Sequence, residues 1–181
     1  MAEFYSELDD TLRAFIDEQK MFFTATAPTD GRINLSPKGM DTLRCLDCKT
    51  VAYLNITGSG NETAAHLVEN GRLTIMFCSF SEEPLILRLY GHGRVIHRRD
   101  AEWSTLFSLF DPLPGARQII VLDIDSVQTS CGFAVSVFEF TRERDTLRRY
   151  WARKGQQGVE AFWRENNQVS IDGLPTTVVA R

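Results

Sequence analysis

Long apolar runs, an excess of basic residues and a complete set of metal ligands are all missing from this sequence. No apolar run approaches the roughly 18–20 residues that a membrane-spanning helix needs, so we expect no membrane partner. The net charge of −4 argues against a nucleic-acid partner, because such proteins normally present a basic face. The acidic, helix-like pattern of residues 1–20 does not resemble a signal peptide, which predicts a cytoplasmic protein with reduced thiols.

Cysteine and histidine are scarce, with four and three residues respectively. Cys45 and Cys48 form a C-x-x-C pair, a spacing that occurs in zinc and redox sites. A tetrahedral zinc site needs a second such pair or a pair of histidines, and the sequence has neither. His92 and His97 are an odd number of residues apart on one predicted strand, so they point to opposite faces. We therefore expect no metal site and no redox pair.

Apolar residues are present in sufficient number for one core of ordinary size, since 43% of the 181 residues are hydrophobic. We predict a single domain over residues 1–181. Its parts are an N-terminal helix at 6–20, a barrel core at 21–140, and a C-terminal helix and tail at 142–181.

Short strands dominate the predicted secondary structure. A doubly wound parallel sheet would need a helix between nearly all strands, and most of these helices are missing. The predicted fold class is therefore mainly β, a split barrel of six to seven mostly antiparallel strands with peripheral helices. Strands are predicted at 21–26, 33–35, 51–56, 73–80, 85–97, 118–124 and 133–140. Helices are predicted at 6–19, 60–70, 101–110 and 142–166, the last with a break near Gly155–Gly158.

A glycine-rich loop, TGSGNET at residues 57–63, joins a predicted strand to a predicted helix. One interpretation needs no ligand: Ser59 and Glu62 have the spacing of a capping box, and Gly71 supplies a left-handed C-terminal cap. The other interpretation is an anion site at the free amides of the helix start. The loop matches neither the Walker nor the dinucleotide fingerprint.

The anion interpretation needs a positive charge that the loop itself lacks. Ser36 and Lys38 follow a neighbouring strand and lie on the same side of an extended chain. If the two strands pair, Lys38 faces the loop and supplies the cation. A lysine exposed in a turn is the alternative interpretation. Hydroxyl and amide groups that could meet the anion belong to Thr57, Ser59, Asn61 and Thr63.

The order of these segments resembles the FMN-binding split barrel of the pyridoxamine 5'-phosphate oxidase-like family. The resemblance is carried by "GRINLSPKG", "VAYLN", "TGSGNET", "AAHLVEN", "RLTIMF" and "ILRLYGHGRV", and it covers roughly residues 21–97. The segment "QTSCG" at 128–132 resembles a subgroup of uncharacterised relatives. What the resemblance implies is a homodimer that binds two FMN molecules between its subunits.

The resemblance also implies where the flavin lies. The isoalloxazine is expected along residues 32–38, with the strand at 53–55 beside it and the phosphate at the loop. Trp151 either stacks near the flavin or is a half-buried helix aromatic. The implied cofactor-binding residues are Asn34, Ser36, Lys38, Tyr53, Ser59, Asn61, Thr63 and, from the partner subunit, Gln128 and Ser130.

Three departures separate this chain from true pyridoxamine 5'-phosphate oxidases. Those enzymes place an arginine and a lysine where Glu62 and Thr63 stand here, and their glutamine near the flavin falls at Ile86. Their C-terminal arginine before Leu-x-Pro falls at Gly173, which removes a bidentate phosphate clamp. We therefore expect FMN binding without pyridoxamine phosphate oxidation.

Several functions stay open on the sequence. The first is an FMN-dependent oxidoreductase that acts on a small-molecule substrate, and the second is a flavin carrier without a substrate. A deazaflavin in place of FMN, haem binding through His92, and a purely structural dimeric barrel are further alternatives. No residue pair stands out as an acid–base couple, and His66 is expected to have a surface or packing role rather than a catalytic one.

Overall fold

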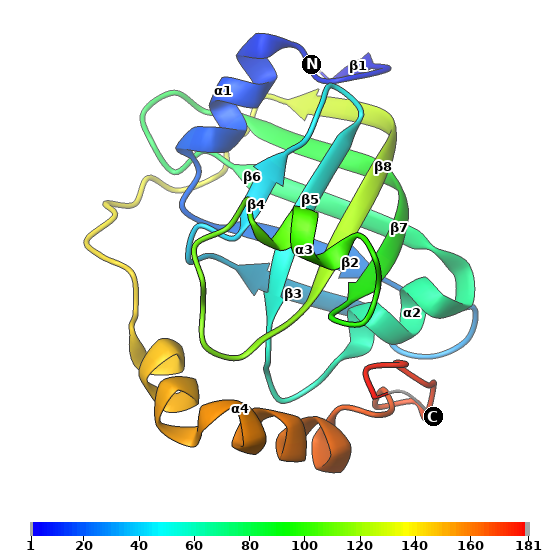
Figure 1. Ribbon diagram of the computed structural model, residues 1–181. Helices are drawn as coiled ribbons and strands as arrows, with labels where there is room; N and C mark the ends of the chain where they lie inside the picture. The colour runs from blue at the N-terminus through cyan, green and yellow to red at the C-terminus, as the bar shows by residue number, and fades with distance from the viewer. Residues whose placement is uncertain (1, 180–181) are drawn as a thin grey trace.

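The computed structural model describes residues 2–179. The ends of the predicted domain and tail, residues 1 and 180–181, lie outside this range. The described chain forms an eight-stranded antiparallel sheet in the order β3-β2-β6-β7-β8-β5-β4, with β1 paired to β8, and the sheet curls into a half-barrel (Figure 1). The strands are β1 (Glu3–Tyr5), β2 (Phe22–Thr26), β3 (Asn34–Lys38), β4 (Leu43–Cys45), β5 (Thr50–Ile56), β6 (Arg72–Cys78), β7 (Ile86–His97) and β8 (Ala116–Ser130).

Within residues 2–179 four helices lie around this sheet: α1 (Asp10–Glu18), α2 (Glu62–Asn70), α3 (Trp103–Phe107) and α4 (Thr146–Asn166). The predicted fold class, a mainly β split barrel with peripheral helices, is confirmed. The predicted break in the last helix is also confirmed, because Gly155 has φ 66° and ψ 175° within α4. No helix within residues 2–179 is both long enough and apolar enough to cross a membrane.

The prediction of a strand at 133–140 is wrong. Gly132 has φ 66°, which turns the chain off the sheet directly after β8. The segment then leaves the sheet, and Phe133 and Phe138 are 81% and 66% exposed. Within residues 2–179 a single backbone hydrogen bond, from Phe138 N to Phe80 O at 2.9 Å, joins it to the chain just after β6. Alternating apolar residues without a partner strand do not make a strand.

The core fills the barrel with apolar side chains from most strands. Strand β5, between β8 and β4, is buried from Val51 to Asn55, because one face meets the barrel interior and the other meets the cover formed around α3. Strand β7 has a bulge at Tyr90–Gly91, where its register with β8 shifts. A Cβ atom at Gly91 would lie 1.9 Å from the Asp123 carbonyl oxygen, so only glycine permits this close approach.

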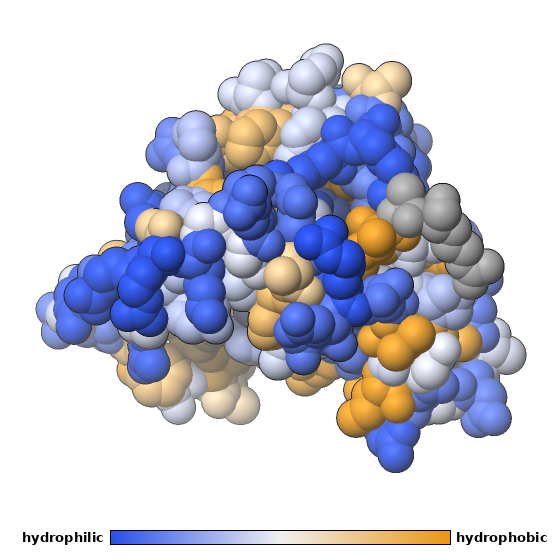
Figure 2. Space-filling model, turned by 60° about the horizontal axis from the view of Figure 1, so that its bottom comes forward, coloured by the Kyte–Doolittle hydropathy of each residue, from blue (hydrophilic) through white to orange (hydrophobic). Residues whose placement is uncertain are grey.

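The lower end of the barrel is closed by α4 and the segment after it, residues 167–179, which we call the C-terminal segment (Figure 1). Trp151, Val159 and Trp163 of α4 form a small apolar cluster with Val178 of the C-terminal segment. Figure 2 turns this end toward the viewer and shows a mostly hydrophilic surface with a few hydrophobic patches. This closure is what positions the loop after β5.

Candidate functional site

The loop after β5 does not form the predicted capping box. Helix α2 begins at Glu62 and its N-cap is Asn61, whose side chain makes no capping hydrogen bond. Glu62 instead accepts a hydrogen bond from the backbone N–H of Ile171, at 2.9 Å, in the C-terminal segment. The Asn61 side chain is occupied elsewhere, because it exchanges hydrogen bonds with Gln118 of β8. The predicted left-handed cap at Gly71 is confirmed, with φ 71°.

The backbone carbonyls of this loop are satisfied from behind. Trp151 donates its indole N–H to Thr57 O at 2.9 Å, and Asn167 donates its amide to Gly58 O at 3.2 Å and Ser59 O at 3.4 Å. In contrast, the backbone N–H groups of residues 58–63 donate no hydrogen bond to any part of the chain within residues 2–179. The backbone carbonyl groups therefore hold the loop in place, and its backbone N–H groups stay free to bind a ligand, as an anion site requires.

A cavity of about 750 Å³ and a smaller one of about 290 Å³ both reach Lys38 at the end of β3. The smaller cavity, which we call the polar pocket, lies between β3, the loop after β5 and the start of α2. It brings together six of the predicted cofactor-binding residues: Asn34, Ser36, Lys38, Ser59, Asn61 and Thr63.

Strand β3 presents its polar residues to the polar pocket because every second side chain of a strand points the same way. Ser36 donates to the side-chain oxygen Oδ1 of Asn34 at 3.0 Å. The Asn34 side-chain amide donates to Thr63 at 3.1 Å and to Thr26 at 3.2 Å. The pairing of β3 with the strand before the loop, on which the predicted placement of Lys38 depends, does not occur: β3 pairs with β2, and side-chain contacts such as Asn34–Thr63 connect it to the loop.

The strongest feature of the polar pocket is Arg117, which the sequence reasoning missed. Its side chain is buried, at 3% exposure, and donates to Asn55 Oδ1 at 2.8 Å, Asn167 Oδ1 at 2.7 Å and Gly60 O at 3.0 Å. Its Nε has no hydrogen-bond partner, and it forms no ion pair with any described carboxylate. A charged residue among the apolar letters of "ARQIIVLDI" was the available signal.

Two cations face the polar pocket: Arg117, which is buried and has only neutral hydrogen-bond partners, and Lys38, which is half-buried. Burial lowers the pKa of Arg117 to about 9, so the guanidinium stays charged at neutral pH. Burial, and then repulsion by Arg117, lowers the pKa of Lys38 to about 8. Glu62 is the carboxylate of the pocket, and its charge partly offsets Arg117. Buried cations without a counter-ion are costly, which favours an anionic ligand.

The other predicted cofactor residues lie outside the polar pocket. Tyr53 is fully buried in the barrel, packs edge-on against Phe22, and has its pKa raised to about 12 by burial. Gln128 and Ser130 lie at the far end of β8, where they accept hydrogen bonds from Tyr90 and Arg88.

Trp151 is buried rather than half-buried, at 3% exposure, and its indole supports the loop from behind.

None of the three histidines forms part of the polar pocket. His66 is buried, as the predicted packing role requires, and its Nδ1 lies 2.9 Å from Thr26 Oγ1. His92 is exposed on β7 and pairs with Asp125 at 3.0 Å. His97 is buried beside Thr177, and burial lowers its pKa to about 4. Within residues 2–179 no group of histidine, cysteine or acidic side chains is arranged to hold a metal.

Comparison with known proteins identifies a family. The sequence model of the family described as "Pyridoxamine 5'-phosphate oxidase" matches residues 8–131. The pyridoxamine 5'-phosphate oxidase family protein ustO of Aspergillus flavus is 38% identical over 195 residues, which cover 97% of this chain and 78% of that protein.

Solved structures show the same fold at low sequence identity. A putative pyridoxamine 5'-phosphate oxidase from Lactobacillus delbrueckii has a TM-score of 0.54 and 18% identity, covering 68% of this chain and 94% of that chain. An FAD binding protein from Mycobacterium smegmatis has a TM-score of 0.50 and 13% identity, covering 70% and 97%. Because the family match ends at residue 131, α4 and the C-terminal segment lie outside it.

Proposed function

This chain belongs to the pyridoxamine 5'-phosphate oxidase family, and from that premise we propose that it is a flavoprotein whose polar pocket binds the phosphate of FMN. The observation that carries the proposal is Arg117, a buried guanidinium with a free Nε and without a carboxylate partner in the described chain. A phosphate dianion would neutralise Arg117 and Lys38 together. Charge-assisted hydrogen bonds of this kind are among the strongest in proteins.

The remaining groups of the polar pocket suit a phosphate as well. The free backbone N–H groups of residues 58–63 and the start of α2 supply donors and the positive end of a helix dipole. The hydroxyl groups of Ser36 and Thr63 supply further polar contacts. The volume of about 290 Å³ is at the lower limit for small-molecule pockets, so it holds the phosphate end and not the ring system.

FMN would supply hydride and electron transfer, and the protein would orient it and exclude competing reactions. We propose that the activity is oxidoreduction of a small molecule. Pyridoxamine phosphate oxidation is not proposed, because the position of the C-terminal arginine is Gly173 and Glu62 is engaged with the C-terminal segment. A flavin carrier without a substrate is the alternative. Haem gains no support, since the candidate ligand His92 is exposed and paired with Asp125.

We also propose a homodimer, with Gln128 and Ser130 meeting the flavin of the partner subunit. Both residues lie far along β8 from the polar pocket of their own chain, and both already have polar neighbours that fix their side chains. Two exposed apolar side chains, Leu35 of β3 and Ile33 just before it, support a covered surface beside the polar pocket.

The test is a titration with FMN, riboflavin and inorganic phosphate, followed by flavin absorbance and fluorescence. We expect FMN to bind at least about tenfold more tightly than riboflavin, because only FMN has the phosphate that the two cations recognise. Phosphate should compete with FMN. Equal affinity for FMN and riboflavin would contradict the phosphate assignment, and absence of binding by either would contradict the flavoprotein. Turnover of NADH or NADPH with a quinone or oxygen then separates an enzyme from a carrier.

A further inference from the structure

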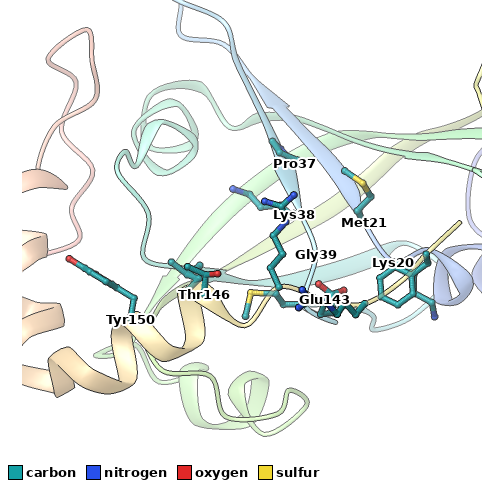
Figure 3. A pocket seen from close by; sticks show the side chains of 13 residues that line it. Lys20, Met21, Pro37, Lys38, Gly39, Glu143, Thr146 and Tyr150 are labelled. Atoms are coloured by element: carbon teal, nitrogen blue, oxygen red, sulfur yellow. The ribbon is translucent and has the colours of Figure 1, made fainter. Parts of the chain in front are cut away.

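The larger cavity, of about 750 Å³, has no role in the function proposed so far. It lies between the ends of β2 and β3 on one side and residues 140–150 on the other. Figure 3 shows Lys38 at its centre, Lys20 and Met21 on the side of β2, and Thr146 and Tyr150 on the side of α4. We call it the apolar cavity, because side chains that form much of its wall are Met21, Pro37, Met40, Phe140 and Leu147.

Positive charge surrounds this apolar wall. Lys20, Lys38, Arg142 and Arg144 line the apolar cavity, and Glu143 is the one carboxylate among its lining residues. None of these four cations forms an ion pair within residues 2–179. The protein as a whole carries a net charge of −4, so this concentration of unpaired cations runs against the overall charge. A concave, low-dielectric surface with one sign of charge concentrates ligands of the opposite sign.

The two properties together define a class of ligand. The apolar wall favours a ring or another apolar body, and a volume of this size accommodates a typical small molecule. Arg142 and Arg144 present planar guanidinium groups, which match a carboxylate through two parallel hydrogen bonds. Amines and other cations would meet like charge.

The position of the apolar cavity connects it to the flavin site. Lys38 lines both the apolar cavity and the polar pocket, so the two are neighbours that share one side chain. The ring system of FMN does not fit within the polar pocket and must extend beyond it. We propose that the apolar cavity binds an organic acid with an apolar body as the substrate of the flavoprotein. That the acid is a substrate rests on the proposed function. That the acid binds in the apolar cavity does not depend on it.

The test uses 2-naphthoate as the anionic probe and 2-naphthylmethanol as the uncharged comparator, with binding measured by calorimetry. The variant pair Arg142→Gln/Arg144→Gln removes two lining charges. Arg148→Gln/Arg153→Gln removes the same charge from exposed positions of α4 that do not line the cavity. We expect 2-naphthoate to bind the lining variant about tenfold more weakly than the wild type, and the control variant within about twofold. The affinity for 2-naphthylmethanol should be the same in both variants as in the wild type.

Equal weakening in both variants would mean a general charge effect and would overturn the proposal. Competition between 2-naphthoate and FMN would also overturn it, because the apolar cavity would then hold the flavin ring. Simultaneous binding, with the flavin absorbance band shifted by 2-naphthoate, would support it. A protein that binds 2-naphthoate through Arg142 and Arg144 but fails to bind FMN would keep the acid site and refute the proposed flavin function.

Discussion

Arg117 is the residue on which the proposed site depends most. A buried guanidinium surrounded by amide and carbonyl oxygens is well hydrogen-bonded but not neutralised. The fold therefore pays a desolvation cost that a bound anion would offset. A bound anion would account for a cation at the start of β8, between the buried residues Ala116 and Gln118.

Replacing Arg117 with Gln should weaken FMN binding by about tenfold to a hundredfold, because a charge-assisted contact to the phosphate is lost. Riboflavin affinity should stay within about twofold, since riboflavin has no phosphate. Fluorescence titration of both ligands measures this. Circular dichroism and thermal unfolding of the variant serve as the folding control. An equal loss for both ligands would show that the substitution damages the pocket in general.

Lys38 makes FMN affinity depend on pH. Its pKa is about 8 in the folded protein, below its usual value of 10.5, so half of the ligand-free molecules have lost this proton at pH 8. A bound phosphate raises this pKa again, and the affinity for FMN should therefore fall as the pH rises through 8. The Lys38→Met variant should bind FMN weakly, and its affinity should fall less than that of the wild type between pH 7.5 and about 9.5, because Arg117, with a pKa of about 9, is then the one of the two cations that still titrates.

The same group has the opposite effect on the stability of the ligand-free protein. Between pH 8 and 10.5 the unfolded chain binds more protons at Lys38 than the folded chain does. The free energy of unfolding therefore gains a contribution from Lys38 that rises with pH across this window. The contribution of Lys38 is the difference in the free energy of unfolding between the wild type and Lys38→Met, measured by denaturant unfolding at pH 7.5 and 9.5. If this difference became less favourable to the wild type as the pH rose, the lowered pKa of Lys38 would be contradicted.

At the scale of elements, the C-terminal segment acts as a clamp on the loop after β5. Asn167 is fully buried and contacts both the loop carbonyls and Arg117. Trp163 donates to Thr57 Oγ1 at 2.8 Å, and Asp172 accepts a hydrogen bond from the backbone N–H of Arg32. One short stretch of chain therefore fixes the arginine, the loop and the approach to β3.

Asn167→Ala should weaken FMN binding by about tenfold and lower the free energy of unfolding by about 1–3 kcal/mol, because buried partners lose their hydrogen bonds. The neighbouring Asn166 is exposed and contacts only Phe162 O in its own helix, so Asn166→Ala is a matched control. We expect the control to change either quantity little. Titration with FMN and urea unfolding measure both. If the two variants behaved alike, the clamp would have no role in binding.

Sequence patterns predicted the helices and most of the strands, but not the contacts between distant segments. The strand–loop–helix order around TGSGNET and the position of Asn34, Ser36 and Lys38 on one face follow from local periodicity. The capping box failed because Ile171, far along the chain, takes the Glu62 side chain that it needed. Arg117 and Asn167 were missed because their partners are distant in the sequence, and a charged residue within an apolar run does not indicate what it contacts.

Strand boundaries show a related limit. Strand β8 runs from Ala116 to Ser130, well beyond the predicted 118–124, because its ladder continues past the acidic residues Asp123 and Asp125. Backbone hydrogen bonds to β7 sustain the strand there whatever the polarity of its side chains. The three-residue strands β1 and β4 are too short to give a periodic signal.

At the scale of the whole molecule, an exposed apolar edge bears on the proposed dimer. Strand β3 is an edge strand of the sheet; its residue Leu35 is 65% exposed, and Ile33, just before the strand, is 78% exposed. Apolar edges of this kind mark interfaces or are protected against pairing. Their position on the opposite face from Ser36 and Lys38 would place a partner next to the flavin site.

Leu35→Glu should convert the proposed dimer to a monomer, because it would bury a charge in the interface. The fold should persist, since the side chain is exposed in the single chain. Val169→Glu, at a 54% exposed position of the C-terminal segment, is the control and should leave the dimer intact. Light scattering after size-exclusion chromatography gives the masses. A wild type that is monomeric at micromolar concentration, with FMN bound, would contradict the dimer.

The distribution of the polar pocket along the chain also has a consequence for biosynthesis. Its residues come from β3, the loop after β5, the start of β8 and, through Asn167, a segment that is synthesised after the whole barrel. Strands β1–β8 are complete by residue 130, so a nascent chain holds a barrel whose phosphate loop has not yet been clamped. On the proposed function, FMN is therefore bound tightly only after α4 and Asn167 have been synthesised. The fraction of flavin-loaded protein in a cell extract would then report how many chains extend past α4.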